Sequence, residues 1–311
     1  MNPAWPLFGH DAAETAFLES ARTGKLHHGW LIEGPSGVGK ATLAHRLAAY
    51  MLGARGPDTA PLDATEQDPV ARICLAGGHP DLRIVKRELN DKGKLRQDIS
   101  VDQIRDLTHF FSLKPAQGGW RIGIIDSLDE LNRNGANALL KTLEEPPGHS
   151  LLFLVNHGST SILPTIRSRC RTLRVTPLGE DDTRKALDSA GAPDEAFALA
   201  RGRPGLGMRL ATPSGLAAAH AAKTLLKSLP RPNDGLVTDA LQTASSDETA
   251  MEAFQEEILS WLAGRAEEDA SAAKAWLDVS RRASEARALN MDPAQTAAKL
   301  IAGLYAPART H

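Results

Sequence analysis

A glycine-rich segment between an apolar stretch and a helical stretch constrains the fold of this chain more than any other feature. Residues Gly34–Lys40 have the sequence Gly-Pro-Ser-Gly-Val-Gly-Lys, which matches the pattern Gly-x4-Gly-Lys. Residues 30–33 before it have the character of a buried strand, and residues 42–52 after it that of a helix. Backbone N–H groups in such a loop wrap phosphate oxygens, and the helix start adds partial positive charge. We therefore predict a phosphate-binding loop, with an ordinary strand-to-helix turn as the alternative.

Four more apolar segments indicate strands of the same sheet. They lie at residues 81–85, 121–126, 151–155 and 172–175. Helical patterns stand between several of them: Ser100 and Gln103 form a capping-box sequence, and an apolar stripe ends before Pro146. Strands that alternate with helices favour a parallel α/β sheet, whose ligands bind at the carboxyl ends of the strands. Residues 53–72 are rich in turn-forming residues and predict a surface excursion.

Strand patterns stop after residue 177. Beyond it, short helical segments are broken by glycine and proline, and the chain then becomes an alanine-rich helical sequence. An apolar stripe is formed there by Met251, Phe254, Ile258 and Leu262. Asp292 followed by proline predicts the start of a final helix. We therefore predict an α/β domain at residues 1–177, a small helical lid at 178–213 and a helical carboxy-terminal domain at 214–311.

Composition limits the kind of protein this can be. The apolar fraction is 42% and the charged fraction 24%, as in soluble α/β proteins. The net charge of −2 lacks the basic signature of a chain that binds nucleic acid by itself. Two cysteines, Cys74 and Cys170, are too few for a four-ligand zinc module or a disulfide framework. Without a signal-peptide pattern or an apolar run of membrane-spanning length, we expect a cytoplasmic protein with no membrane partner.

Two positions near the loop depart from a site that hydrolyses nucleotide. The residue after the loop lysine normally supplies a hydroxyl ligand to magnesium, but here it is Ala41. Thr42 is rotated by about 100° around the helix and cannot take the same place. Asp126 ends its strand where a magnesium-holding carboxylate belongs, yet it is followed by Ser127, a poor general base. We therefore predict that ATP or ADP binds with weak or absent hydrolysis, and we leave magnesium binding open.

A polar residue at another strand end completes the predicted site. Asn156 stands where a side chain either senses the outer phosphate or caps the following loop. We expect no metal-binding cluster of histidine and cysteine in the chain. The residues predicted to bind nucleotide are Gly34, Pro35, Ser36, Gly37, Val38, Gly39, Lys40, Ala41, Thr42, Asp126 and Asn156.

Several segments together resemble a known family. They are His27–Ala44, His79–Leu82, Ile99–Arg105, Ala136–Pro147 and Leu163–Cys170. Over about residues 8–177 the chain resembles the delta-prime subunits of the bacterial DNA polymerase III clamp loader, which are AAA+ proteins. The resemblance implies an AAA+ parallel sheet sandwiched by helices, followed by a small helical lid and an all-helical collar used for oligomerisation. The sequence Pro-Thr-Ile-Arg-Ser-Arg-Cys is the most specific of these signals.

The resemblance also implies partners. Motor subunits of the gamma/tau type, a delta subunit and this chain would form a hetero-pentamer that opens the sliding clamp and places it on primed DNA. Arg169 would be an arginine finger directed at ATP on the adjacent motor subunit. A guanidinium brought in this way stabilises charge on the transferring phosphoryl group. The alternative is a surface arginine that caps a strand or pairs with a carboxylate.

Some positions depart from the wider AAA+ pattern. Gly205 stands where motor subunits have a lid arginine that senses nucleotide, and Arg203 or Arg209 is the alternative residue for that role. Members of the family often carry zinc-binding cysteines before His79, whereas this chain has only Cys74 there. The resemblance therefore implies a subunit without zinc and with little ATPase activity of its own.

Two other functions compete with this interpretation. A self-sufficient motor ATPase of the gamma/tau type is the main alternative, and Ala41, Ser127 and Gly205 count against it. A small-molecule kinase would need a substrate pocket and lid arginines that the sequence does not indicate. Glu144 and Glu145 could be paired catalytic carboxylates, but their place at a helix end before two prolines favours a role in the helix end and its interface.

Overall fold

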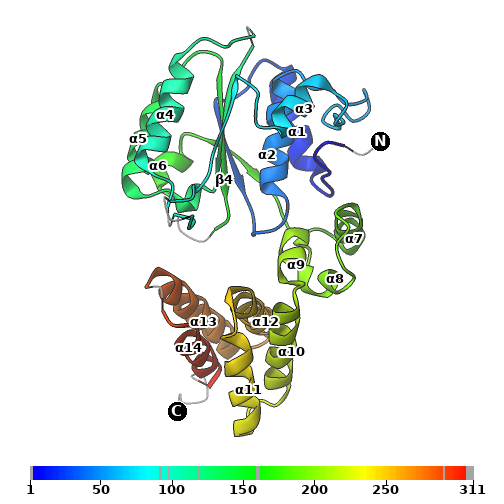
Figure 1. Cartoon of the computed structure of the whole chain (residues 1–311), viewed down its shortest axis with the longest axis vertical. Helices are drawn as coiled ribbons and strands as arrows, with labels where there is room; N and C mark the ends of the chain where they lie inside the picture. The colour runs from blue at the N-terminus through cyan, green and yellow to red at the C-terminus, as the bar shows by residue number, and fades with distance from the viewer. Residues whose placement is uncertain are drawn as a thin grey trace. The chain divides into compact units, whose positions relative to one another are not determined.

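The computed structural model describes residues 3–90, 93–96, 98–117, 119–158, 162–289 and 291–305. The chain folds into two compact units (Figure 1), one of residues 1–191 with 201–205 and the other of residues 192–200 with 206–311. Each unit has its own hydrophobic core. Among the described helices, none is long and apolar enough to cross a membrane.

A parallel sheet forms the centre of the first unit. Its described strands have the order β2-β3-β4-β1-β5, and every pairing is parallel. The strands are β1 (Gly29–Glu33), β2 (Leu82–Val85), β3 (Arg121–Asp126), β4 (Ser150–Asn156) and β5 (Arg171–Arg174). Each lies within about one residue of a predicted strand, so the predicted sheet is confirmed.

Helices cover both faces of this sheet (Figure 1). They are α1 (Asp11–Arg22) and α2 (Lys40–Met51) on one face, and α4 (Val101–Ser112), α5 (Arg133–Glu144) and α6 (Pro164–Arg167) on the other. Alternation along β1 explains the two layers, because Trp30 and Ile32 join one core and Leu31 joins the other. The predicted architecture, a parallel sheet between helical layers followed by helices, is confirmed.

α3 (Pro69–Leu75) lies where the sequence predicted the end of a surface excursion. The Asp68 carboxylate accepts a hydrogen bond from the Ala71 N–H, and Pro69 is the first helical residue. Ala71 and Cys74 are buried in a small core of their own. The prediction for residues 53–72 was therefore wrong at its end, because the surrounding turn-forming residues obscured an Asp-Pro helix start.

Two predicted helix starts are confirmed. The Ser100 hydroxyl accepts from the Gln103 N–H, and the Gln103 side chain accepts from the Ser100 N–H, which is a complete capping box at α4. The Asp292 carboxylate accepts from the N–H groups of Ala294 and Gln295 at the start of α14. Both caps satisfy N–H groups that the first turn of a helix leaves unpaired.

The described residues of the second unit form helices and the turns between them, without a strand. Phe254, Ile258 and Leu262 of the predicted stripe are buried in its core, and Met251 is half-buried against it. The helices outside the sheet layers are α7 (Glu180–Ser189) in the first unit, α9 (Pro204–Leu210) across the division, and α8 (Glu195–Ala200), α10 (Pro213–Lys227), α11 (Asp234–Ala244), α12 (Glu248–Ala266), α13 (Ala270–Ala288) and α14 (Pro293–Tyr305) in the second. The three-part division at residues 177 and 213 stays a prediction.

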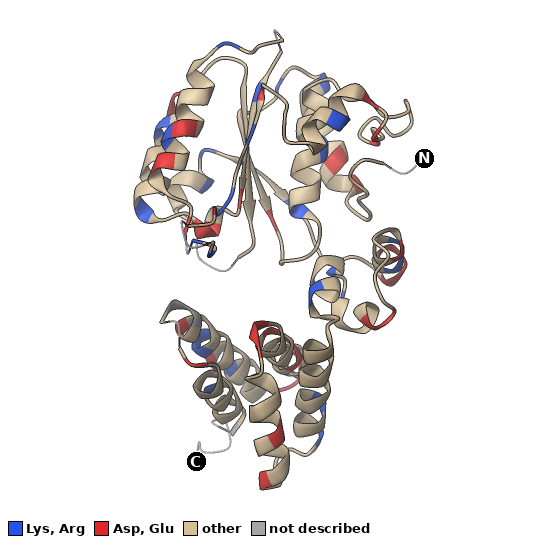
Figure 2. Ribbon diagram, viewed as in Figure 1, with Lys and Arg blue, Asp and Glu red and all other residues tan. Residues whose placement is uncertain are grey.

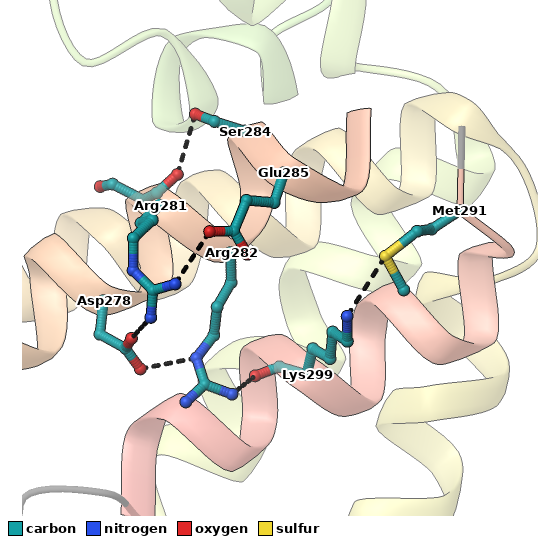
Figure 3. Close-up of polar contacts among 8 residues, drawn as sticks. Asp278, Arg281, Arg282, Ser284, Glu285, Met291 and Lys299 are labelled. Carbon is teal, nitrogen blue, oxygen red and sulfur yellow. Dashed lines mark hydrogen bonds and ion pairs between the residues drawn. The ribbon is translucent and has the colours of Figure 1, made fainter. Parts of the chain in front are cut away.

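Charged side chains connect the last two helices of the second unit. Arg281 pairs with Asp278 and Glu285 along α13, and Arg282 also pairs with Asp278 (Figure 3). Arg282 reaches α14, where it donates to the Lys299 carbonyl oxygen at 3.3 Å. Exposed ion pairs of this kind add little stability one by one. Acidic and basic residues are interspersed over both units (Figure 2), in agreement with the small net charge.

Candidate nucleotide site and arginine motif

The glycine-rich loop leaves the sheet at the carboxyl end of β1 and leads into α2. In the parallel register, Glu33 at the end of β1 lies opposite Asn156 of β4. Asp126 at the end of β3 lies opposite Val155 of the same strand. The loop, Asp126 and Asn156 therefore share one edge of the sheet, which is where open α/β sheets bind ligands.

Lys40 is buried inside its own loop. The residue is 2% exposed, and Nζ donates to the carbonyl oxygens of Gly34 at 2.7 Å and Pro35 at 2.6 Å. Burial lowers the pKa of Lys40 to about 8, while the negative charges of Asp129 and Asp126 act in the opposite direction. The ammonium group is thus held by loop carbonyls at the start of α2, where phosphate oxygens bind in loops of this type.

Backbone geometry requires two of the loop glycines. A Cβ atom on Gly34 would lie 2.3 Å from the Val175 carbonyl oxygen. Gly39 has a φ of +104°, a conformation that residues with a Cβ rarely adopt. The loop therefore needs glycine at both positions to keep its path between β1 and α2.

His10 contacts the loop from the segment that precedes α1. Its ring is buried, and Nε2 lies 2.7 Å from the Val38 carbonyl oxygen. With its proton on Nε2, the ring donates to this oxygen and holds the loop in place. Sequence reasoning missed this residue, because a single histidine ahead of a helix has no motif that connects it to a loop so far along the chain.

Carboxylates that could bind magnesium lie near the loop, but the hydroxyl ligand that normally follows the loop lysine is missing. Ala41 is the second residue of α2 and carries no oxygen on its side chain. The Ser127 hydroxyl donates to the Asp129 carboxylate, which also accepts from the His157 N–H at 3.2 Å. Asp129 lies in η1 (Leu128–Glu130) and was not predicted as a site residue. The loop fits a nucleoside phosphate, and Asp126 and Asp129 suit magnesium, but one ligand of the usual set is missing.

Asn156 caps the loop that follows β4. Its side chain is buried, and Oδ1 accepts from the Gly158 N–H at 3.2 Å. This contact corresponds to the loop-capping role, one of the two roles predicted for Asn156. The phosphate-sensing role stays a prediction.

Gly205 lies directly against the phosphate loop. Its N–H donates to the Gly37 carbonyl oxygen at 2.9 Å, and a Cβ atom on it would lie 3.2 Å from the Gly37 backbone. A side chain at position 205 would therefore crowd the loop. Arg209, one of the two alternatives for the lid arginine, forms a two-point ion pair with Glu252 within the second unit, at 3.0 and 2.7 Å.

Two arginines of the segment Pro164–Cys170 are held in different ways. Arg167 forms a two-point ion pair with Glu33, at 2.8 and 2.6 Å, and the Glu33 side chain is only 15% exposed. Arg169 makes one contact of 2.8 Å with Glu144, whose side chain is 48% exposed, and donates to the Thr165 carbonyl oxygen at 2.9 Å. Arg167 is therefore fixed to β1 by two hydrogen bonds, whereas Arg169 is held by one exposed carboxylate and one carbonyl oxygen.

The cysteines are not placed for chemistry. Burial raises the pKa of the Cys74 thiol to about 11 and that of Cys170 to about 12, so both stay protonated at neutral pH. In the described part of the chain, no group of three or more His, Cys, Asp or Glu side chains could hold a metal ion. That the protein works without zinc stays a prediction.

A known protein family matches the part of the chain that contains the phosphate loop and the arginine segment. The family described as DNA polymerase III, delta subunit, matches residues 9–179, which is more than half of the chain. The chain belongs to this family. The matched region contains the phosphate loop, Asp126 and the segment Pro164–Cys170.

Similar proteins include both delta-prime and gamma subunits. The DNA polymerase III subunit delta-prime of Pseudomonas aeruginosa is 38% identical over 143 residues, which cover 46% of this chain and 41% of that protein. The corresponding Escherichia coli subunit is 31% identical over 198 residues, or 62% of this chain and 57% of that protein. A Buchnera aphidicola gamma subunit is 32% identical over 178 residues, or 57% and 46%. The chain thus spans about half the length of the relatives it matches.

Proposed function

We propose that this chain is a delta-prime-type subunit of a DNA polymerase III clamp loader. In this role it takes part in the ATP-dependent loading of a sliding clamp onto primed DNA. Its partners are motor subunits of the gamma/tau type and a delta subunit, assembled in the cytoplasm as a hetero-pentamer. It supplies an arginine to the nucleotide of a neighbouring motor subunit and hydrolyses little or no ATP itself. The family match and the similarity to delta-prime subunits support this proposal.

The observation that carries the proposal is the difference between Arg167 and Arg169. Both belong to the segment that gives the family resemblance, but both terminal nitrogens of Arg167 donate hydrogen bonds to the Glu33 carboxylate. Arg169 has one exposed carboxylate partner. A phosphate in a neighbouring subunit can accept hydrogen bonds from N–H donors of Arg169 that its own contacts leave exposed. Arg169 is therefore the residue suited to act in trans.

The subunit's own loop is proposed to bind ATP or ADP. The N–H groups at the start of α2 and the Lys40 ammonium would hold the phosphates, with Asp126 and Asp129 on the metal side. A bound magnesium ion would neutralise charge on the outer phosphates. Ala41 removes its hydroxyl ligand, and Ser127 is hydrogen-bonded to Asp129 in place of an acid that could orient water. Binding with little turnover is the expected result.

A self-sufficient motor ATPase is the second candidate, since a gamma subunit is among the similar proteins. The same two positions, Ala41 and Ser127, argue against it. Gly205 adds to that argument, because its backbone lies against the loop where the motor subunits are expected to have an arginine. Rapid turnover by the isolated chain would favour this second candidate.

The decisive experiment is Arg169→Ala in the assembly reconstituted with motor and delta subunits. Hydrolysis at the site facing this chain should fall by about 10³-fold or more, because the transition state loses its trans guanidinium. The control is Arg174→Ala, which removes an exposed arginine at the end of β5. A normal rate with Arg169→Ala would overturn the proposal, as would fast ATP turnover by the isolated wild-type chain.

A further inference from the structure

Glu144 is placed at a helix end where a carboxylate is unfavourable. It is the last residue of α5, and its side chain is exposed. The carbonyl groups at a helix carboxyl end carry partial negative charge, which disfavours an acidic side chain nearby. Its ion pair with Arg169, at 2.8 Å, offsets this repulsion. The contact therefore gives a reason for an acid at this position that the helix by itself does not provide.

Arg169 is held at two points on different elements. NH1 donates to the Thr165 carbonyl oxygen at 2.9 Å, within the α6 segment, and lies 3.4 Å from the Ser168 hydroxyl. NH2 contacts Glu144 at the end of α5. Together these contacts fix the direction of a long side chain that is still 35% exposed. A guanidinium has five N–H donors, more than these contacts use, so it can stay anchored and still offer donors to a second anion.

We propose that Glu144 is a positioning residue for Arg169. This inference rests on the proposed function, since it concerns how the arginine meets the nucleotide of a neighbouring subunit. An arginine without a local partner samples many rotamers, and ordering it at the moment of reaction weakens its contribution. Glu144 keeps the guanidinium in one orientation.

The neighbouring residue provides a matched control. Glu145 is also exposed and follows Glu144 at the same helix end. Its backbone N–H donates to the Lys141 carbonyl oxygen, which a change of side chain does not remove. Glu144→Gln and Glu145→Gln therefore remove the same charge from nearly the same place. They differ in whether the lost carboxylate is the one in contact with Arg169.

The experiment compares these variants in the reconstituted assembly. Glu144→Gln should lower kcat at the site facing this chain by about 3- to 10-fold, because Arg169 then regains part of its rotamer freedom. KM should stay within about twofold of the wild-type value. Glu145→Gln should match the wild type. In the double variant with Arg169→Ala, Glu144→Gln should cause no further loss, because a residue that acts through Arg169 has no effect once Arg169 is gone.

The outcomes separate this inference from the proposed function. If Arg169→Ala itself has no effect, the proposed function fails and the inference fails with it. If Arg169→Ala slows hydrolysis but Glu144→Gln equals the wild type, only the inference is overturned. A faster rate with Glu144→Gln would overturn it too, because Glu144 would then restrain Arg169 rather than position it. Equal losses in Glu144→Gln and Glu145→Gln would indicate a general charge effect and also reject the inference.

Discussion

The phosphate loop and the arginine segment each carry a cation, but the first is buried and the second is partly exposed. Lys40 is 2% exposed and donates to carbonyl oxygens of its own loop. Arg169 is 35% exposed and held by a carboxylate that is itself accessible. A nucleotide must enter the loop to reach Lys40, whereas Arg169 is available to a molecule outside the chain. The difference supports the proposal that one cation serves the chain's own ligand and the other a neighbour's.

The two regions are also connected. Glu33 is the last residue of β1, directly before the loop, and it holds Arg167 of the arginine segment by two hydrogen bonds. β1 and β5 are neighbours in the sheet, so this ion pair joins segments that the backbone already brings together. The loop and the arginine segment are therefore connected through β1. The carboxyl end of this strand leads into the loop, whereas its first residue, Gly29, lies beside the Arg169 backbone.

The largest effect that tests this comparison is expected for Lys40→Met. This change keeps an apolar stem and removes the charge that would bind the outer phosphates. The affinity of the isolated chain for ATP should fall by about 100-fold, the value of one or two charge-assisted hydrogen bonds. Titration calorimetry measures this loss. In the assembly, Lys40→Met should leave hydrolysis at the neighbouring site near the wild-type rate; a loss as large as that of Arg169→Ala would contradict the division of roles.

A smaller effect is expected when the connection between the regions is broken. Glu33→Gln, Arg167→Gln and the double variant form a mutant cycle for the two-point ion pair. The coupling in the free energy of unfolding of the α/β unit should be about 1.5 kcal/mol, because the pair is charge-assisted and Glu33 is largely buried. Denaturant unfolding of the four proteins measures it. Purely additive losses would show that the two residues act independently of each other.

The strands and the edge of the site could be predicted from the sequence, but the side-chain pairs could not. The strands are short apolar segments, and the parallel arrangement places the loop, Asp126 and Asn156 at one edge. The contacts of His10, Glu33 and Glu144 join residues far apart in the chain. No periodic pattern relates such residues, because each contact depends on how the elements pack.

The helical unit illustrates the same limit. The stripe containing Phe254 and Ile258 predicted which face is buried, and Asp292 predicted where the last helix begins. The core is rich in small alanines, so many alternative pairings of its helices would bury similar areas. Periodicity therefore identified the helices and their faces but left their arrangement undetermined. The pairing of Arg209 with Glu252 belongs to this undetermined part.

The smallest effect concerns pH and again separates the loop from the arginine segment. Burial lowers the pKa of Lys40 to about 8, below its unfolded value of about 10.4. Between these values the unfolded chain binds more protons than the folded chain, so this residue makes stability rise with pH there. Nucleotide binding should change in the opposite direction, since it needs the charged ammonium. ATP affinity should therefore fall by about five- to tenfold from about pH 7.5 to 9.

Lys40→Arg provides the control for this pH dependence, because a guanidinium stays charged over the whole range. Its ATP affinity should be nearly constant between the same pH values, whatever its absolute level. The contribution of Arg169 to hydrolysis in the assembly should likewise show no step near pH 8, since arginine does not titrate there. If Lys40→Arg retained the full fall in affinity, another group would be responsible, and the buried lysine would no longer distinguish the loop from the arginine segment.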